Sequence, residues 1–237
     1  AILGETYSAG PDSRFHLLLV DPAGDLLWER TYDGGPLHER GLAILELEDG
    51  YLLVGNAMDS TSGSTATSSD GFAVRVDTAG REVWQRGYGG AAHDILHHAA
   101  PLGSDAFVLT GYSRGFNAAG PNDLWVVRIA ADGTVRDQAN GGGAGADHNI
   151  QARPVGDASV ALAGYTTSRG AGDWDAEVLV IDCALAIRWS AAYGTPGPDG
   201  AVAVFPTPGS GLVVAGYTTA TDGYGRDIVV FRLGETS

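Results

Sequence analysis

The chain repeats one pattern at a spacing of about 52 residues, and this repeat constrains the fold more than any other feature of the sequence. Its clearest marker is a glycine at the end of an apolar run, as in LLVGNA, VLTGYS, ALAGYT and VVAGYT. These marker glycines are Gly55, Gly111, Gly164 and Gly216, and a degenerate copy stands at Gly4. A unit of this length cannot bury its apolar faces alone, so neighbouring units must pack against one another.

Each unit contains four stretches that are typical of short β-strands. The marker strand is followed by a polar, glycine-rich loop that usually ends in aspartate, and then by an apolar or alternating run such as GFAVRVD or AEVLVID. A turn of the Asp-x-x-Gly kind leads into a further run such as EVWQRGY. The remaining stretch opens the unit at a constant distance before the marker glycine. No helical periodicity interrupts this order.

These units predict an all-β fold, a five-bladed β-propeller that forms a single domain over residues 1–237, because radial stacking buries the faces of every sheet. The sequence holds four complete units, and the additional strands at the N-terminus and the C-terminus are expected to meet and close the ring. About two strands are then missing from the shared blade. Two blades of three strands each would account for this. Completion by a neighbouring molecule would also do so, and would make the protein an oligomer.

The order of these stretches resembles the repeats of a class of bacterial propellers. GYTTSRGAGDWD, then VRVDTAGREVWQRGYGG, then a short inner strand is similar to the pattern GYT…D…VD..G..W…YGG of secreted or surface β-propellers. The units also look distantly like kelch repeats and like the W-motif of quinoproteins. The resemblance covers nearly the whole chain and implies a secreted, periplasmic or cell-surface protein. It implies little about function, since such propellers serve as binding platforms, lectins and enzymes.

The third unit departs from the pattern that carries this resemblance. Asp137 stands where Trp84 would be, and Gly141 stands where Tyr88 would be. We therefore expect the third blade to be packed differently from the others.

Composition and charge narrow the range of partners. Hydrophobic residues make up 44% of the chain and charged residues 18%, as in a globular protein. The formal net charge of −15 disfavours nucleic acid and anionic membrane surfaces, although such a charge would also serve solubility alone. No apolar run reaches the ~18 residues that a membrane helix needs, so no membrane insertion is expected. The sequence indicates no cofactor.

Cys183 is the only cysteine of the chain, so an internal disulfide and a thiolate metal cluster are both excluded. It stands in the run VLVIDCALAIRW, whose apolar residues predict a buried side chain.

The stretch that opens each unit is expected to form the innermost strand of a blade. Aligned without gaps, the four copies begin at His38, Asp94, Asp147 and Asp199. Strict alternation gives each strand one small, apolar face that packs on the next blade and one polar face that looks into the central channel or its mouth. The polar faces together contain His38, Arg40, Asp94, His98, Asp147, Asn149, Gln151, Arg153 and Asp199.

The recurring aspartates have a structural interpretation. A residue present in nearly every unit serves the fold, and aspartate at the start of a strand caps the N–H groups of the preceding turn. Residues that break the repeat, such as His98, His38 and Arg153, are better candidates for function because the fold does not require them.

A first functional hypothesis is a binding module for a carbohydrate or a protein, on the loop face or in the central channel. Lectin-like propellers build shallow pockets from an aromatic ring and hydrogen-bonding groups, and the loops SRGFNAAGPND, TTSRGAGDWD and TTATDGYGRD have this content. Trp28, Trp84 and Trp189 share one repeat position and are expected in blade packing, whereas Trp125 and Trp174 stand beside loops. The candidate ligand-binding residues are His38, Arg40, Asn149, Gln151, Trp125 and Trp174.

An alternative is a hydrolase or another enzyme that acts in the channel. Asp94, Asp147 and Asp199 would then be the catalytic carboxylates, one as acid and one as base. His98 would transfer protons, and Arg153 would stabilise an anionic group or an oxyanion.

Two further interpretations remain open. His38, His98 and His148 could hold a metal ion together with the repeated aspartates, although His148 is expected on the opposite face of its strand. The chain could also be a purely structural repeat module of a larger surface protein.

Overall fold

The computed structural model describes residues 1–7, 13–34, 38–59, 68–90, 92–116, 120–209, 211–219 and 225–234. The regular secondary structure of these residues consists of β-strands alone, which confirms the all-β prediction. The chain divides into two compact units, Ala1–Ala99 and Ala100–Ser237, and each is described by itself.

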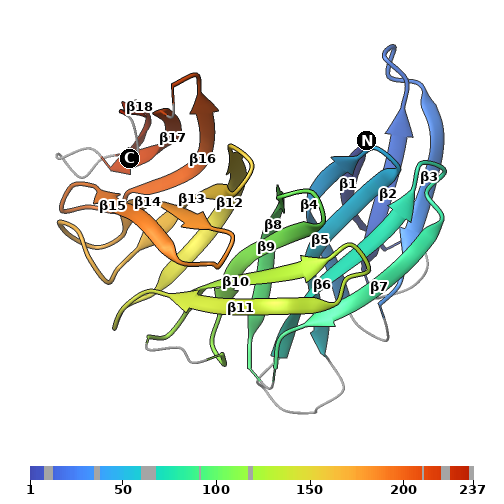
Figure 1. Cartoon of the computed structure of the whole chain (residues 1–237), viewed down its shortest axis with the longest axis horizontal. Coiled ribbons are helices and arrows are strands. Elements are labelled where there is room, and N and C mark those ends of the chain that lie inside the picture. The colour runs from blue at the N-terminus through green and yellow to red at the C-terminus, as the bar shows by residue number, and fades with distance from the viewer. Residues whose placement is uncertain are drawn as a thin grey trace. The chain divides into compact units, whose positions relative to one another are not determined.

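The strands form five small antiparallel sheets, each built from strands that follow one another in the chain (Figure 1). The first sheet contains β1 (Ile2–Thr6), β2 (Arg14–Val20) and β3 (Leu26–Tyr32). The second contains β4 (His38–Leu47), β5 (Gly50–Asp59), β6 (Ser68–Asp77) and β7 (Glu82–Tyr88). The third contains β8 (Asp94–Leu102), β9 (Ala106–Ser113), β10 (Asp123–Ala130) and β11 (Val135–Gly141). The fourth contains β12 (Asp147–Val155), β13 (Ser159–Thr166), β14 (Asp175–Asp182) and β15 (Ile187–Tyr193), and the fifth contains β16 (Gly200–Thr207), β17 (Gly211–Thr219) and β18 (Arg226–Leu233).

Each four-stranded sheet corresponds to one unit of the sequence repeat, in the order opening strand, marker strand, apolar strand and tryptophan strand. The two terminal sheets have three strands each, as one of the two alternatives for the missing strands requires. Among the residues that the structure describes, the first sheet has no opening strand and the fifth has no tryptophan strand. Within the described residues, β18 is therefore the edge of its sheet.

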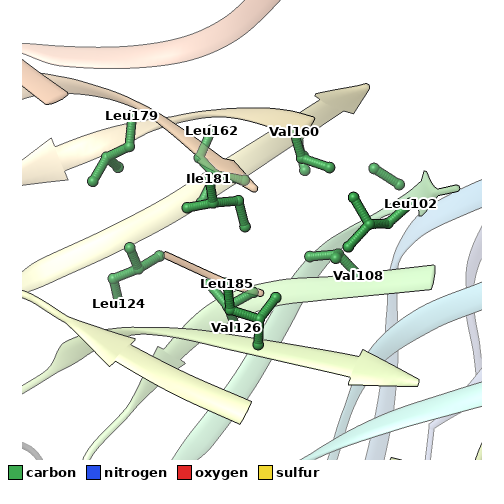
Figure 2. Close-up of a cluster of buried hydrophobic side chains, with 11 residues drawn as sticks. Leu102, Val108, Leu124, Val126, Val160, Leu162, Leu179, Ile181 and Leu185 are labelled. Carbon is green, nitrogen blue, oxygen red and sulfur yellow. The ribbon is translucent and has the colours of Figure 1, made fainter. Parts of the chain in front are cut away.

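Within each of the two compact parts of the chain, neighbouring sheets pack face to face through apolar side chains. In the second compact unit, Ala100–Ser237, Leu124 and Val126 of the third sheet meet Leu162, Leu179 and Ile181 of the fourth (Figure 2). A second cluster in this unit joins the fourth sheet to the fifth, and in the first unit a similar cluster joins the first sheet to the second. Trp28 and Trp189 pack against these clusters, as their shared repeat position predicts.

The marker glycines are explained by a β-bulge in the neighbouring opening strand. The register shifts between Gly41 and Ala43 in β4, and the equivalent shift occurs in β12 and β16. At the bulge a carbonyl group lies so close to the marker strand that a Cβ at Gly55, Gly164 or Gly216 would clash with it. Glycine is required at this point because no other residue leaves the space.

The same bulges show that the expectation of strict alternation was wrong. In β12 the register shifts between Asn149 and Gln151, so the two residues do not share a face. The buried residues of this strand are Asp147, Asn149 and Ala152, whereas Gln151 and Arg153 are half-buried. The single polar face predicted for each opening strand is thus divided between two faces.

The ungapped alignment of the first opening strand also needs correction. Gly41 pairs with the marker Gly55, as Asn149 pairs with Gly164 in the fourth sheet. This places Glu39, and not His38, at the position of the repeated aspartate. The reason is a turn between β4 and β5 that is one residue shorter than the turn between β12 and β13.

Cys183 is exposed, contrary to the prediction of a buried thiol. It lies in the turn between β14 and β15, which Asp182 organises by accepting hydrogen bonds from the N–H groups of Ala184 and Ala186 at 2.8 and 2.9 Å. The apolar residues on both sides belong to the two strands, and the turn itself faces solvent.

Candidate ligand-binding site

Four rings form a stacked aromatic ladder in the second unit. The His148 centroid lies 4.1 Å from that of Tyr112 and 4.7 Å from that of Tyr165. Trp174 stacks on the far side of Tyr165 at 4.6 Å, with an angle of only 7° between the two planes. We call Tyr112, His148, Tyr165 and Trp174 the aromatic ladder.

The repeat places these rings at one end of the third and fourth sheets. Tyr112 and Tyr165 directly follow marker glycines, and His148 pairs with Tyr165 across β12 and β13. The Tyr165 hydroxyl and His148 Nδ1 are hydrogen bonded at 2.9 Å, which fixes both rings. Burial raises the pKa of Tyr165 to about 12, so its hydroxyl stays protonated at neutral pH.

Trp174 is the exposed end of the ladder, with 37% of its surface open to solvent. Its loop is held in place from both sides. Asp175 accepts hydrogen bonds from the Ala171 N–H at 3.1 Å, and the Trp174 carbonyl accepts one from the Asp199 N–H at 2.6 Å. The indole is therefore a fixed apolar platform rather than a side chain on an unrestrained loop.

An ion pair between an exposed arginine and a buried glutamate lies beside this platform. Arg169, from the loop before Trp174, pairs with Glu177 of β14 and donates a hydrogen bond to the Ser190 hydroxyl at 3.2 Å. Arg169 is exposed and carries further N–H groups. It is the cationic hydrogen-bond donor of the Trp174 loop.

The repeated carboxylates have structural partners, as the capping interpretation predicts. Glu39, Asp94, Asp147 and Asp199 are all buried and stand at the start of opening strands. Each accepts a hydrogen bond from a backbone N–H of the preceding connection. The donors are Gly34, Gly90, Gly143 and Thr195, at 3.1, 2.9, 2.9 and 2.6 Å respectively.

Asp147 is the most completely satisfied of these groups. The Thr166 hydroxyl donates to its Oδ1, and the Ser168 hydroxyl donates to its Oδ2 at 2.6 Å. Both oxygens are thus used in fixing the end of the sheet. This is the environment of a structural carboxylate.

The other residues of the enzyme hypothesis have separate local contacts. His98 donates a hydrogen bond from Nδ1 to the Ala99 carbonyl at 2.9 Å. The Arg153 guanidinium lies over the Phe205 ring, with Cζ 5.6 Å from the centroid. Neither contact aims the side chain at a capping carboxylate.

Among the candidate ligand-binding residues, Trp125 and Asn149 are buried and serve the fold. Trp125 is only 2% exposed and donates from Nε1 to Gln138 Oε1 at 3.3 Å, so the prediction of an exposed platform at this residue was wrong. Asn149 accepts from the Thr110 hydroxyl at 2.6 Å and donates to two carbonyls. Among the predicted tryptophan platforms, Trp174 is the exposed one.

The remaining three candidates lie outside the aromatic ladder. Gln151 Oε1 accepts a hydrogen bond from the Val204 N–H at 2.8 Å. His38 Nδ1 accepts one from the Ser13 N–H at 3.2 Å, and Arg40 is exposed with its Nε 3.9 Å from Glu5 Oε2. The predicted loops also include residues 117–119 and 220–224, which lie outside the described residues.

Sequence reasoning missed Tyr112, Tyr165 and the stacking role of His148. The signal was present, since a tyrosine follows the marker glycine in three successive units, at Tyr112, Tyr165 and Tyr217. A tyrosine that recurs at the loop end of a strand suggests a row of rings. The insertion of His148 and Trp174 into that row depends on the fold.

Fold and site define a repeat protein of small antiparallel sheets that presents a row of aromatic rings at one end of its second unit. No protein-family model matches the chain, and no curated protein matches it. Among the residues that the structure describes, no cluster of three or more His, Cys, Asp or Glu side chains could hold a metal ion. The same residues include no helix long and apolar enough to cross a membrane.

Proposed function

We propose that the chain is a carbohydrate-binding module whose platform is Trp174. The observation that carries the proposal is the exposed indole, which stacks on the first of three further rings in a row and is fixed by its loop. The apolar face of a pyranose ring stacks on such a surface, and a rigid platform loses little conformational entropy on binding. Arg169, in the same loop, supplies hydrogen-bond donors for sugar hydroxyls.

The proposal includes the five-bladed propeller as the architecture of the whole chain. It is supported by five meander sheets in sequence order and by the face-to-face packing of neighbouring sheets in each unit. The first and last sheets carry exposed apolar residues, among them Ile2, Leu27, Ile228 and Val230. A ring in which these two sheets meet would cover such residues.

A glycan array followed by affinity electrophoresis in soluble polysaccharides tests the binding proposal. Trp174→Ala is expected to weaken binding to the retained sugar at least about tenfold, because the stacking surface is lost. Phe205→Ala is the matched control, since it removes another exposed ring outside the aromatic ladder. Retention of no glycan, or equal effects of the two substitutions, would contradict the proposal.

The channel-centred enzyme has less support. Its carboxylates Asp94, Asp147 and Asp199 cap turns, and His98 and Arg153 have local partners. Simultaneous replacement of the three aspartates by asparagine tests it, because hydrolase activity that disappears in a folded triple variant would favour the enzyme.

A further inference from the structure

A cavity of about 440 Å³ lies between the fourth and fifth sheets of the second unit, among β14, β15, β17 and β18. This is the size of pocket that holds a small organic molecule. Its walls are mainly aromatic and apolar, with the rings of Tyr193, Tyr217 and Phe231. Its charged lining residues are Asp199 and Arg232.

The cavity arises where the fifth sheet lacks a fourth strand. At the equivalent position between the third and fourth sheets, Ile187 of β15 lies 3.4 Å from the point where a Cβ of Gly141 would be. Between the fourth and fifth sheets, Tyr193 stands at the position of Gly141. The strand that would correspond to β15, which carries Ile187, is not present beside β18 within the described residues. The space is therefore a feature of this pair of sheets.

Asp199 brings an incompletely satisfied carboxylate to this cavity. The side chain is 2% exposed, and its Oδ2 accepts hydrogen bonds from the Thr195 N–H at 2.6 Å and the Thr195 hydroxyl at 3.0 Å. Its Oδ1 is buried and has no hydrogen-bond partner among the described residues. A buried carboxylate oxygen without a donor is unfavourable, so a ligand that supplies one gains affinity.

Asp147 shows how the equivalent oxygen is satisfied in the fourth sheet. Its Oδ1 accepts a hydrogen bond from the Thr166 hydroxyl. Thr218 stands at the position of Thr166 in the fifth sheet. At Asp199, however, Oδ1 has no hydrogen-bond partner among the described residues.

Asp199 is the acidic residue of the cavity lining. Burial acts to raise the pKa of Asp199, but the hydrogen-bonding groups of Thr195, the Thr218 hydroxyl and the Thr219 N–H outweigh it and hold the pKa below its ordinary value. The Thr218 hydroxyl makes no well-formed hydrogen bond to Oδ1. The free oxygen thus belongs to a carboxylate anion at neutral pH.

We propose that this cavity binds a small organic cation, whose ammonium group donates to Asp199 Oδ1 and whose apolar part contacts the rings of Tyr193, Tyr217 or Phe231. A buried anion is best compensated by an opposite charge, and aromatic faces attract cations. One of these rings, Tyr217, already has a guanidinium beside it, since Arg226 Cζ lies 4.4 Å from the Tyr217 centroid. The cavity does not include the Trp174 indole, although the Asp199 N–H donates to the Trp174 carbonyl.

Arg232 is the group that opposes this choice, because its positive charge would favour an anion. It is exposed, whereas Asp199 is buried, so solvent screens the guanidinium more than the carboxylate. The net charge of −15 also attracts cations to the protein as a whole.

Three probes of nearly equal size test the charge preference by calorimetry and ligand-observed NMR: benzylamine, benzyl alcohol and benzoate. Benzylamine is expected to bind at least about tenfold more tightly than the other two, because hydrogen bonds to charged groups are the stronger ones. Equal binding of benzyl alcohol would overturn the proposal in favour of a neutral hydroxyl site. Preferential binding of benzoate, or binding of none of the three, would also overturn it.

Variants locate the site. Asp199→Asn keeps an acceptor for the Thr195 N–H but removes the charge, and is expected to weaken benzylamine binding at least about tenfold. Asp227→Asn, which removes an exposed charge from the same sheet, should leave binding unchanged. Benzylamine that binds equally well to a folded Asp199→Asn variant would refute the role of this carboxylate.

A second pair of variants does not involve Asp199 and covers the case in which Asp199→Asn fails to fold. Val229 lines the cavity, whereas Val230 on the other face of β18 is exposed. Val229→Phe should fill the cavity and abolish binding, and Val230→Phe should not. Similar affinities for these two variants would exclude the cavity as the site.

Discussion

At the scale of single residues, Leu185 occupies a backbone conformation that other turns of the chain reach with glycine. Its φ is 61°, and the corresponding Gly24, Gly80 and Gly133 have φ values of 92°, 72° and 80°. The side chain is buried in the cluster between the third and fourth sheets (Figure 2). Burial of this leucine therefore maintains a conformation that leucine itself disfavours.

Replacement of Leu185 shows which of the two effects is larger. Leu185→Gly relieves a strain of about 1 kcal/mol but removes a buried side chain worth about 2–5 kcal/mol. We expect the free energy of unfolding to fall, as measured by urea denaturation. Gly24→Ala, at an open position with positive φ, serves as a control for strain alone. An unchanged or raised stability of Leu185→Gly would contradict the argument.

Glu177 gives the pH dependence a definite sign. Burial raises the pKa of Glu177, although Arg169 opposes this. A group with a raised folded pKa stabilises the fold below its unfolded pKa, and this contribution is lost as the pH rises through the folded pKa. Glu177→Gln cannot ionise, so the free energy of unfolding of this variant should rise relative to that of the native chain as the pH rises above the ordinary glutamate pKa of about 4. Urea titrations at several pH values would show a constant difference if Glu177 were unimportant.

Residue roles could be predicted from the sequence where the repeat itself carries them. The capping aspartates recur, so their structural role follows from recurrence. Trp125 and Trp174 both stand outside the packing register, yet one is buried and the other exposed. The sequence cannot separate them because burial depends on which sheet covers each side chain.

At the scale of elements, the β-bulge in the opening strand is the feature that sequence patterns did not reveal. An inserted residue reverses the alternation beyond it, and neither hydrophobic pattern nor turn chemistry marks its position in these strands. The marker glycine is its only sign, since glycine stands where the bulge leaves no space. The predicted faces failed after the bulge for this reason.

The bulge makes a sharp prediction for the marker glycine. A Cβ at Gly164 would clash with the His148 carbonyl oxygen, which is backbone and cannot move aside easily. Gly164→Ala should lower the free energy of unfolding by about 3 kcal/mol or more. Gly87→Ala, where nothing lies within 4 Å of the added Cβ, should have little effect. Equal changes in the thermal midpoints of the two variants would refute the close approach as the reason for the glycine.

At the scale of the whole molecule, the repeat predicted the all-β class and the four short strands of each repeat. It does not determine whether the sheets close into a ring, because closure depends on the angle between neighbouring sheets, and residue patterns within one sheet do not encode that angle. The strand count of the terminal sheets was open for a similar reason. Two three-stranded sheets and one shared sheet are compatible with the same sequence of strands.

Small-angle X-ray scattering tests the proposed ring. A compact chain of this length has a radius of gyration of about 18 Å. We expect this value at all protein concentrations for a closed propeller. A markedly larger value would indicate an extended row of sheets, and a value that rises with concentration would indicate association through the terminal sheets.

The shortened hairpin between β4 and β5 has a consequence for engineering. This hairpin is one residue shorter than that between β12 and β13, yet Glu39 still caps its connection and the bulge still faces Gly55. Length variation is thus absorbed at the hairpin tips, at the opposite end of the strands from the aromatic rings. Epitope tags or grafted peptides placed at those tips, for example within 156–158, would lie away from the proposed carbohydrate platform.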